Sequence, residues 1–370
     1  MINYDEKIKR LKDRRQGLYR KDGSINPQAQ LASILGPITE NFEKIHQPKS
    51  AIYAVGAMQS VGLAYTLKSY EEGDRVRDRL AEGFTSANLL VEFRYQGSVP
   101  LDVHVRGNSD IDLLLLDGFY RTVDPSLMLP PSAYFSHSQV NMETRLNTLR
   151  TEATTILRRR YPEATVDVSG SKAISISGGS LQRSVDIVPS HWHDTVDWKM
   201  HGEQHFRNVF ILDAKQSTRI SNKPFKHIFE IEKRCIQVSG SLRKAIRLLK
   251  NIRYDSSKKL ELSSYDIASL AWHMTDAELT VPFALDLLLI NNVRSFLARL
   301  VADPAATKML DVPDRSRKII NSEAKFSQLC ALFIEVNQLY LDIETELKEY
   351  ANPLSSSVGR LFERPINLPA

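Results

Sequence analysis

Cysteine is scarce in this chain, with only Cys235 and Cys330 among 370 residues. Two thiols are too few for the disulfide framework of a small secreted domain or for a zinc site with four cysteine ligands. The N-terminal residues, MINYDEKIKRLKDRR, lack the apolar stretch of a secretory signal. Both absences predict a protein of the reducing cytoplasm.

One uncharged run, at residues 51–67, is too short to cross a membrane. A membrane-spanning helix needs about 20 apolar residues, and this run also contains Gln59, Ser60 and Thr66. We interpret it as a buried helix and expect no membrane partner.

The charge balance is mildly basic, with a formal net charge of +5 and a pI near 9.0. Such an excess fits an anionic partner such as a nucleotide or a nucleic acid, although many globular proteins share it. The length of 370 residues exceeds the roughly 250–300 residues at which single cores stop growing, so two lobes are expected.

The pattern of apolar residues changes along the chain and predicts an α+β fold. Residues 51–84 and 140–160 have helical spacing, and the runs at 89–95, 111–117, 164–176 and 184–189 are typical of strands. From about residue 225 onward the spacing is helical. We therefore expect a polar, partly helical extension at 1–50, a mixed and mostly antiparallel sheet with helices on one side within 51–215, and a helical lobe at 216–370.

Two acids lie at the start of the apolar run IDLLLLD. Asp112 is the second residue of the run, and Asp110 immediately precedes it. Asp110 and Asp112 are two residues apart, which places both side chains on one face of a strand. Asp-x-Asp is common in exposed loops, but within an apolar strand an uncompensated charge costs several kcal/mol. A bound cation would offset that cost, and carboxylates of this kind suit Mg²⁺.

A third acid and a Gly-Ser pair complete the candidate site. Asp186 is flanked by β-branched residues, and on a strand next to 111–117 it would face the same cations. Gly97 would let the backbone approach a phosphate, and Ser98 could donate a hydroxyl. Two Mg²⁺ ions, for which Mn²⁺ could substitute, would support in-line attack of a ribose hydroxyl on a triphosphate. Asp186 would then be the general base or a ligand to the metal at the attacking hydroxyl.

This arrangement of Gly97, Ser98, Asp110, Asp112 and Asp186 resembles the signature of the polymerase-beta-like nucleotidyltransferase superfamily. Within it the chain resembles the CD-NTase group, the bacterial relatives of animal cyclic GMP-AMP synthase, over roughly residues 70–345. The supporting segments are DRVRDRLAEGF before the Gly-Ser strand, SLRKAIRLLK in the helical lobe, and the Ser-Ser-Tyr sequence at 263–265. The resemblance implies a nucleotidyltransferase core with a mixed sheet, a C-terminal helical nucleotide-binding lobe and a central cleft.

The resemblance also suggests nucleotide contacts in the helical lobe. Arg243, Arg247 and Lys250 recur at i, i+4 and i+7, forming a basic face that either holds a triphosphate or is simply solvated. Lys250 matches the family's triphosphate-contacting lysine. Tyr265 would stack on a base and Ser264 would touch phosphate or sugar, while Ser263 and Ser264 also suit a helix N-cap.

The implied function is the joining of nucleoside triphosphates into a cyclic di- or trinucleotide second messenger for anti-phage defence, with release of pyrophosphate. A nucleic-acid or protein activator, and a downstream effector reached through the product, would be its partners. Three alternatives stay open. They are a polymerase making linear oligonucleotides, a transferase acting on tRNA or a small molecule, and an inactive nucleotide sensor.

A histidine-rich segment follows the third aspartate. His191 and His193 are two residues apart, and His201 and His205 have the i, i+4 spacing of some zinc ligands. Without a cysteine nearby, we favour polar residues beside a nucleotide pocket over a zinc site.

Overall fold

The computed structural model describes most of the chain, namely residues 3–17, 39–105, 109–127, 141–282, 284–350, 362–363 and 365–366. Residues 18–38 of the predicted N-terminal extension lie outside this part. The chain divides into two compact units. The sheet unit comprises Gly62–Pro100 and Ser109–Glu230, and the helical unit comprises Met1–Val61, Leu101–Asn108 and Ile231–Ala370. The domain boundaries expected at residues 50 and 215 stay predictions.

The sheet unit is built on an 8-stranded mixed sheet in the order β1-β2-β6-β5-β4, with β3 and β7 also pairing with β6, and β8 with β7. β2 and β3 run parallel to β6, and the other pairs are antiparallel, as expected. The strands are β1 Val91–Gln96, β2 Ile111–Asp117, β3 Thr122–Val123, β4 Ala164–Asp167, β5 Ile174–Gly178, β6 Val185–Asp194, β7 Asn208–Asp213 and β8 Thr218–Asn222.

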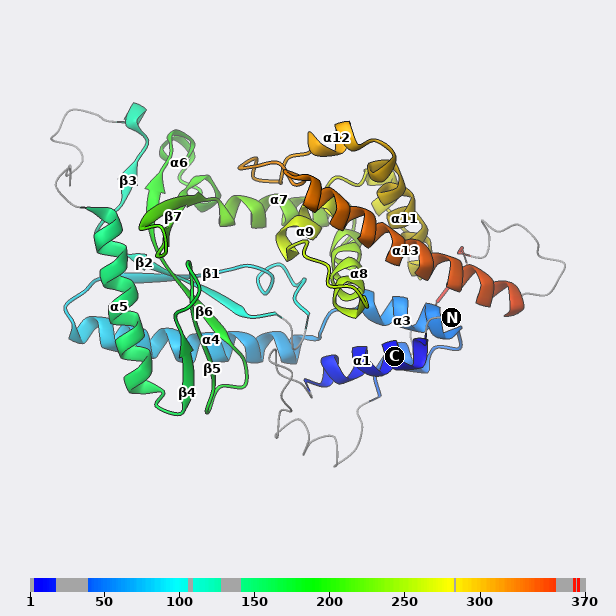
Figure 1. Cartoon of the computed structure of the whole chain (residues 1–370), viewed down its shortest axis with the longest axis horizontal. Coiled ribbons are helices and arrows are strands. Elements are labelled where there is room, and N and C mark those ends of the chain that lie inside the picture. The colour runs from blue at the N-terminus through cyan, green and yellow to red at the C-terminus, as the bar shows by residue number, and fades with distance from the viewer. Residues whose placement is uncertain are drawn as a thin grey trace. The chain divides into compact units, whose positions relative to one another are not determined.

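Both faces of the central strands are covered, which explains the continuous apolar run in β2. Leu113 and Ile187 face a core formed with α4 (Leu63–Ser86) and α5 (Met142–Arg160), the two helices that cover one face of the sheet (Figure 1). Leu114 and Val188 point the other way, into a smaller cluster with β7. Strands buried on both faces lose the hydrophobic alternation seen in half-exposed sheets.

The β7–β8 hairpin was not among the predicted strands. The turn that joins its strands is closed by Asp213, whose carboxylate accepts hydrogen bonds from the backbone of Lys215 and Gln216. β7 pairs at five positions with β8 and at four positions with β6, the strand that precedes it in the chain. Both partners support β7, and the pairing with β6 is the part that a local pattern does not report.

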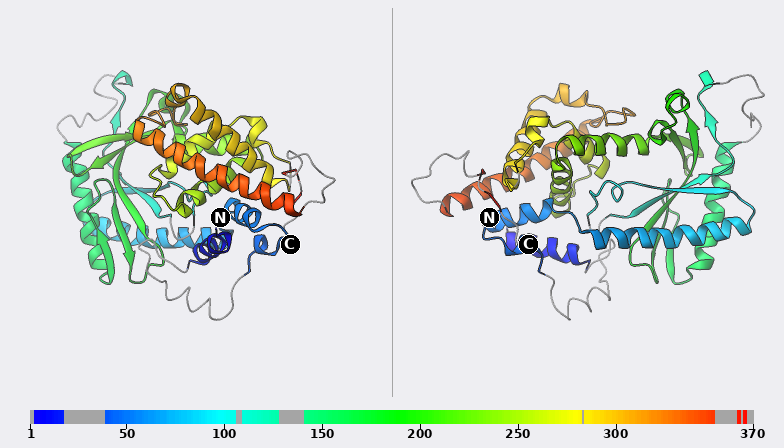
Figure 2. Two further views of the ribbon diagram at one scale, coloured as in Figure 1. Left: turned by 45° about the vertical axis from the view of Figure 1, so that its right-hand side comes forward. Right: turned by 180° about the vertical axis from the view of Figure 1, so that it is seen from behind.

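The helical unit contains the remaining helices apart from the short α6 (Val196–His201) and the first half of α7, which begins within the sheet unit. α11 and α13 lie side by side in both views of Figure 2. Besides α4, α5 and α6, whose bounds are given above, the described α-helices are α1 Tyr4–Gln16, α3 Lys49–Met58, α7 Pro224–Gln237, α8 Ser241–Asp255, α9 Ser264–Trp272, α10 Asp276–Leu279, α11 Asp286–Ala302, α12 Pro304–Lys308 and α13 Glu323–Tyr350.

The uncharged run at 51–67 forms most of α3, a break, and the first residues of α4. The α3 part is buried as expected, whereas Leu63 is exposed at the start of α4. Within the described ranges, no helix combines the length and the hydropathy that a membrane crossing requires.

The N-terminal helix α1 is fastened to the helical unit by a buried ion pair. The Arg14 guanidinium lies 2.5 and 2.7 Å from the two carboxylate oxygens of Asp255 in α8, and the hydroxyl of Tyr53 in α3 donates to the same carboxylate. A bidentate arginine-carboxylate pair has restricted geometry, so α1 holds α8 in a defined position against α3.

His191 in β6 is a buried histidine of the sheet unit. Its Nδ1 lies 2.9 Å from the Trp192 carbonyl and its Nε2 lies 3.2 Å from Arg219, while its ring stacks on Phe210. Burial lowers the pKa of His191 from 6.5 to about 4, against the opposing effect of the Trp192 carbonyl. The ring is therefore a neutral packing group near neutral pH.

Acid should destabilise the fold through this group. Between pH 6.5 and about 4 the unfolded chain binds the proton more readily than the folded chain. The stabilisation is therefore complete above pH 6.5 and lost as pH falls toward 4. It amounts to on the order of 3 kcal/mol of unfolding free energy. We expect His191→Gln to have a smaller loss of stability over this interval than the wild type in urea unfolding. The exposed His201→Gln serves as control, and equal pH slopes in all three proteins would contradict the assignment.

Candidate active site

A row of polar side chains crosses one face of the sheet. Gln96 of β1 pairs with Asp112 of β2, Asp112 with Asp186 of β6, and Asp186 with Ser175 of β5. Residues directly opposite each other on neighbouring strands project to the same side. The two carboxylates are therefore lateral neighbours on adjacent strands, as the sequence interpretation requires.

Asp110 continues this face immediately before β2. The backbone ladder extends beyond the strand, because the amide of Ile111 donates to the carbonyl of Ser184 at 3.1 Å. The Ser184 hydroxyl also donates to the Asp110 carboxylate, an ordering contact that the sequence analysis did not identify. Asp110 and Asp112 are two residues apart in an extended segment, so both side chains face the same side of the sheet.

Gly97 lies against one of these carboxylates. It has a φ of +79°, a conformation that side chains disfavour, and it ends β1 directly after Gln96. A Cβ atom at this position would lie 2.1 Å from Oδ2 of Asp112. Glycine is therefore required both by the backbone conformation and by the space that the Asp112 carboxylate occupies. Ser98 follows in the turn and is partly exposed.

The strand register brings together the carboxylates of Asp112 and Asp186, whose oxygens suit a divalent cation. Two carboxylates on adjacent strands repel each other, and an oxygen-binding cation between them offsets the repulsion. Both side chains are only partly buried. In the part of the chain that the structure describes, no three His, Cys, Asp or Glu side chains are gathered closely enough to hold one ion. The role of the three aspartates as joint ligands thus stays a prediction.

The basic side chains of α8 lie in the helical unit and contact the backbone. Arg243 Nε donates to the carbonyl of Leu101 at 2.9 Å. Arg247 Nη1 donates to the carbonyl of Asp102 at 3.1 Å, and Lys250 Nζ donates to that of Val103 at 2.6 Å.

These three cations are not a solvated face. Lys250 is fully buried and Arg247 is 7% exposed. A direct contact of any of the three with triphosphate stays a prediction.

The start of α9 carries the other predicted nucleotide contacts. Ser263 is the N-cap, since its hydroxyl accepts from the amide of Asp266 while the Asp266 carboxylate accepts from the amide of Ser263. Ser264 is the first helical residue and is partly exposed. The capping function thus belongs to Ser263, and a nucleotide contact of Ser264 stays a prediction.

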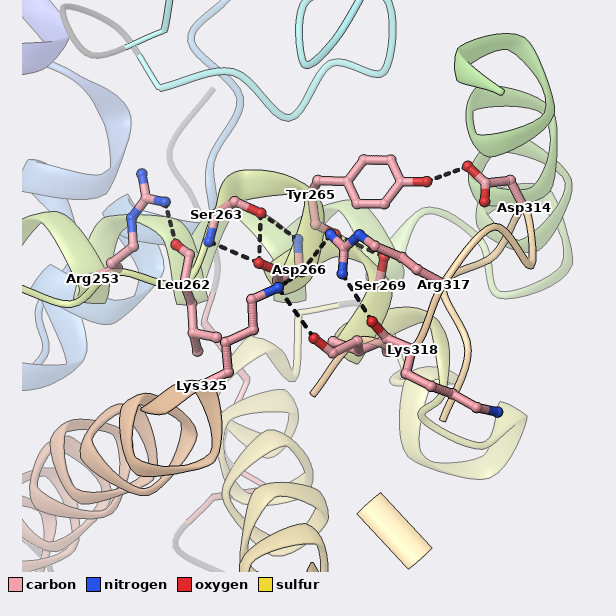
Figure 3. A network of polar contacts seen from close by, with 11 residues as sticks. Arg253, Leu262, Ser263, Tyr265, Asp266, Ser269, Asp314, Arg317, Lys318 and Lys325 are labelled. Atoms are coloured by element: carbon pink, nitrogen blue, oxygen red, sulfur yellow. Dashed lines mark hydrogen bonds and ion pairs between the residues drawn. The ribbon is translucent and has the colours of Figure 1, made fainter. Parts of the chain in front are cut away.

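Tyr265 is held by a polar network (Figure 3). Its hydroxyl donates to the buried Asp314, and the Arg317 guanidinium lies 5.2 Å from the ring centroid. Burial, with Asp314 nearby, raises the pKa of Tyr265 far above its ordinary value, so the hydroxyl remains a donor. Burial alone would raise the pKa of Asp266, but the bonds from Ser263 and Arg317 outweigh it and lower that pKa. The ring is therefore fixed in orientation at the start of α9.

His193 and His205 of the segment 191–205 pack and hydrogen-bond within the sheet unit. The His205 ring stacks on Phe229 with centroids 3.8 Å apart, and His193 Nδ1 lies 2.9 Å from the Thr122 hydroxyl. The first contact joins the segment after α6 to α7, and the second joins β6 to β3.

Comparison with known proteins identifies the family to which this chain belongs. The chain is 36% identical over 316 residues to the cyclic dinucleotide synthase CdnE of Yersinia aleksiciae, covering 84% of this chain and 81% of that protein. It is 34% identical over 246 residues to a c-di-GMP synthase of Capnocytophaga granulosa, covering 60% of this chain and 67% of that protein. No family model matches the chain. The chain belongs to the CD-NTase family.

Solved structures agree with this assignment. The STING-associated CdnE c-di-GMP synthase from Capnocytophaga granulosa aligns with a TM-score of 0.72 and 26% identity, covering 93% of this CD-NTase and 99% of that chain. The structure of a STING-associated CdnE synthase from Flavobacteriaceae, at 20% identity, has the same TM-score of 0.72 and supports the fold. This CD-NTase is therefore a nucleotidyltransferase of the cyclic-oligonucleotide-synthesising group, and the predicted fold class is confirmed.

Two features of the site lay beyond the sequence interpretation. The hydroxyl of Ser184 reaches Asp110, and Ser175 is the register neighbour of Asp186. Ser184 precedes Asp186 by two residues, so its position on the same face could have been inferred from strand period alone. The place of Ser175 depends on the pairing of β5 with β6, which no local pattern reports.

Proposed function

We propose that this CD-NTase joins two nucleoside triphosphates into a cyclic dinucleotide second messenger for anti-phage signalling. The lateral pairing of Asp112 and Asp186 beside Gly97 is the observation that carries the proposal. The relatives named above are cyclic dinucleotide or c-di-GMP synthases, so GTP is the first substrate to test.

The residues of the sheet unit would divide the work of phosphoryl transfer. The backbone at Gly97 and the hydroxyl of Ser98 would hold the triphosphate. Asp186 would accept the proton of the attacking ribose hydroxyl as that oxygen approaches the α-phosphate. A new phosphodiester bond forms as the bond to pyrophosphate breaks, and the proton leaves through the base. Two successive transfers would close the ring.

The cofactor we propose is a pair of Mg²⁺ ions, replaceable by Mn²⁺. Asp110, Asp112 and Asp186 would hold them. When bound, such ions neutralise triphosphate charge and make a hydroxyl more acidic. The hydrogen bond from Ser184 would keep the Asp110 carboxylate oriented for binding.

Product analysis tests this function directly. The full chain is incubated with each labelled triphosphate singly and in pairs, with Mg²⁺ or Mn²⁺, and the products are treated with phosphatase and weighed by mass spectrometry. A phosphatase-resistant species with the mass of a cyclic dinucleotide is expected. A ladder of linear products would support the polymerase alternative. Release of no pyrophosphate under any condition would support the sensor alternative.

Tyr265 is proposed to stack on a nucleotide base. We expect Tyr265→Ala to weaken binding of a non-hydrolysable triphosphate by about 5- to 150-fold, the equivalent of the roughly 1–3 kcal/mol of one base stack. Tyr265→Phe keeps the ring but removes the hydroxyl bond to Asp314, so it separates stacking from positioning. Isothermal titration calorimetry measures both variants. Unchanged affinity of Tyr265→Ala would remove the stacking role.

The partners we propose follow from the product. The Capnocytophaga relative is described as STING-associated, and a separate effector that reads the cyclic dinucleotide would play the corresponding part for this CD-NTase. A nucleic-acid or protein activator would control when synthesis begins.

A further inference from the structure

The loop between α12 and α13, residues 310–319, contacts both ends of α9 within the helical unit. A β-bridge between Asp311 and Lys318 closes the loop. At the C-terminal end of α9, Nε2 of His273 lies 2.7 Å from the carbonyl oxygen of Asp311. At the N-terminal end, the loop binds the hydroxyl of Tyr265. The loop is therefore fastened along the helix that carries the proposed stacking residue.

Asp314 lies in the turn of this loop and is fully buried. Its carboxylate accepts from the hydroxyl of Tyr265 and, at 2.8 Å, from the backbone amide of Ser316 (Figure 3). The second bond spans Arg315, which has a φ of +58°, so the same side chain stabilises the turn. A carboxylate removed from water costs free energy unless donors compensate it. The Tyr265 hydroxyl is one of the donors that offset this cost.

Two more residues of the loop act on the Tyr265 side chain. The Ser316 side chain is a second hydrogen-bond partner of the hydroxyl, and the Arg317 guanidinium lies over the ring, 5.2 Å from its centroid. Arg317 is itself fixed, because it donates to the Asp266 carboxylate at 2.6 Å and to the carbonyl of Lys318 at 3.0 Å. The loop thus sets both the hydroxyl end and one face of the ring.

These contacts with Tyr265 do more than begin the helix. The capping box of Ser263 and Asp266 already satisfies backbone donors in the first turn of α9. Lys325 of α13, 3.2 Å from the Asp266 carboxylate, attaches that turn to a second helix. Tyr265 stays partly exposed although its hydroxyl is bound by a buried residue. A ring held in this way is a preformed surface, since little rotamer freedom is left to lose when a ligand binds.

We infer that Asp314 is a positioning residue for the nucleotide, because it holds the Tyr265 ring in the orientation in which a base stacks on it. The inference rests on the stacking role proposed for Tyr265. Asp314 is fully buried and acts through the tyrosine. The loop 310–319 thereby gains a part in nucleotide affinity.

Binding of ligands with and without a base tests the inference. Isothermal titration calorimetry compares a non-hydrolysable GTP analogue with inorganic tripolyphosphate, which has no base to stack. We expect Asp314→Ala to weaken binding of the analogue by about 2- to 12-fold, the equivalent of about 0.5–1.5 kcal/mol for immobilising one side chain. Affinity for tripolyphosphate should stay at the wild-type value. Equal losses for the two ligands would overturn the inference, because they would indicate general damage to the fold.

Asp342→Ala is the matched control for this substitution. Asp342 of α13 accepts the hydroxyl of Tyr4 in α1 at 2.7 Å, which is the same kind of tyrosine–carboxylate bond at another place in the helical unit. The control should bind both ligands with wild-type affinity. A loss of analogue affinity as large as that of Asp314→Ala would contradict a specific role of the loop.

A double-mutant cycle shows whether Asp314 acts through the ring. In the Tyr265→Ala background the ring is absent, so Asp314→Ala should cause no further loss of analogue affinity. The same fold loss in both backgrounds would overturn the inference. Tyr265→Phe keeps the ring but removes the hydroxyl that binds Asp314 and Ser316. It should therefore weaken binding at least as much as Asp314→Ala does.

A readout without nucleotide separates this inference from the proposed function. Fluorotyrosine is incorporated into the full chain, and the fluorine NMR signal that disappears in Tyr265→Phe is assigned to Tyr265. In Asp314→Ala this signal should sharpen and move toward that of free fluorotyrosine, whereas Asp342→Ala should leave it unchanged. An unchanged signal in Asp314→Ala would overturn the inference. Unchanged analogue affinity in Tyr265→Ala would sink the stacking role, while the fluorine signal would still decide whether Asp314 holds the ring.

Two conservative variants decide the question if Asp314→Ala does not fold. Asp314→Asn keeps an acceptor oxygen for the Tyr265 hydroxyl, so it should retain analogue affinity and the fluorine signal close to wild type. Tyr265→Phe should weaken analogue binding. Wild-type affinity in Tyr265→Phe would contradict the inference, because the bond to Asp314 would then have no effect on the nucleotide.

Discussion

Asp186→Asn is expected to lower turnover by about 10³-fold, because charge stabilisation worth several kcal/mol at the phosphoryl centre is lost. The amide keeps the size of the carboxylate but neither binds a divalent cation as strongly nor accepts the hydroxyl proton. The lateral pairing of Asp186 with Asp112 makes this variant informative, since one of two repelling carboxylates becomes neutral. The free energy of unfolding should therefore stay constant or rise slightly.

Steady-state rates with Mg²⁺ and with Mn²⁺, together with thermal unfolding, check this expectation. Asp78→Asn is the control, because Asp78 lies exposed on α4 in an ion pair with Arg77. The control should match the wild type in both rate and stability. Near-wild-type turnover by Asp186→Asn, or an equal loss in Asp78→Asn, would show that the assigned carboxylate is not at the reacting centre.

Gly97→Ala is the second change for which we expect a large effect. The added methyl would occupy the place of the Asp112 carboxylate, 2.1 Å from its Oδ2, and the carboxylate would have to rotate away. The fold should tolerate that rotation, because Gly97 lies in an exposed turn. The catalytic geometry should not, so we expect kcat to fall by about 10²-fold.

Gly62→Ala separates this displacement from backbone strain. Gly62 has a φ of +85°, comparable to the +79° of Gly97, but no atom lies within 4 Å of an added Cβ. Both alanine variants should lose stability, on the order of 1–3 kcal/mol, because each position holds a positive φ that side chains disfavour. Only Gly97→Ala should lose activity. Equal kcat values for the two variants would show that displacement of Asp112 does not matter.

The sequence predicts the elements of the sheet unit where periodicity is local. β2 coincides with the apolar run IDLLLLD, and the helical spacing of 140–160 corresponds to α5. The β7–β8 hairpin escaped prediction although its two strands are neighbours in the chain; β7 is also paired at four positions with β6, a contact that its own sequence does not report. Strand formation depends on such partners more than on intrinsic preference.

For the candidate residues of the helical unit, too, the sequence predicts the local arrangement but not the tertiary contacts. The i, i+4, i+7 spacing of Arg243, Arg247 and Lys250 indicates correctly that they share a helix face. Spacing does not report what lies opposite that face. The structure places three backbone carbonyls there, and the expected contact of these cations with triphosphate stays a prediction.

By itself, the sequence determined the chemistry available to this CD-NTase: three aspartates in strand-like settings, a Gly-Ser pair, and a helical lobe with cations and a tyrosine. The tertiary structure decided which of these groups are neighbours. Parallel pairing of β2 with β6 puts Asp112 beside Asp186, and the burial of α8 directs its cations to the backbone at 101–103. The physical reason is that strand register and burial arise from contacts between residues far apart in the chain, which no local pattern encodes.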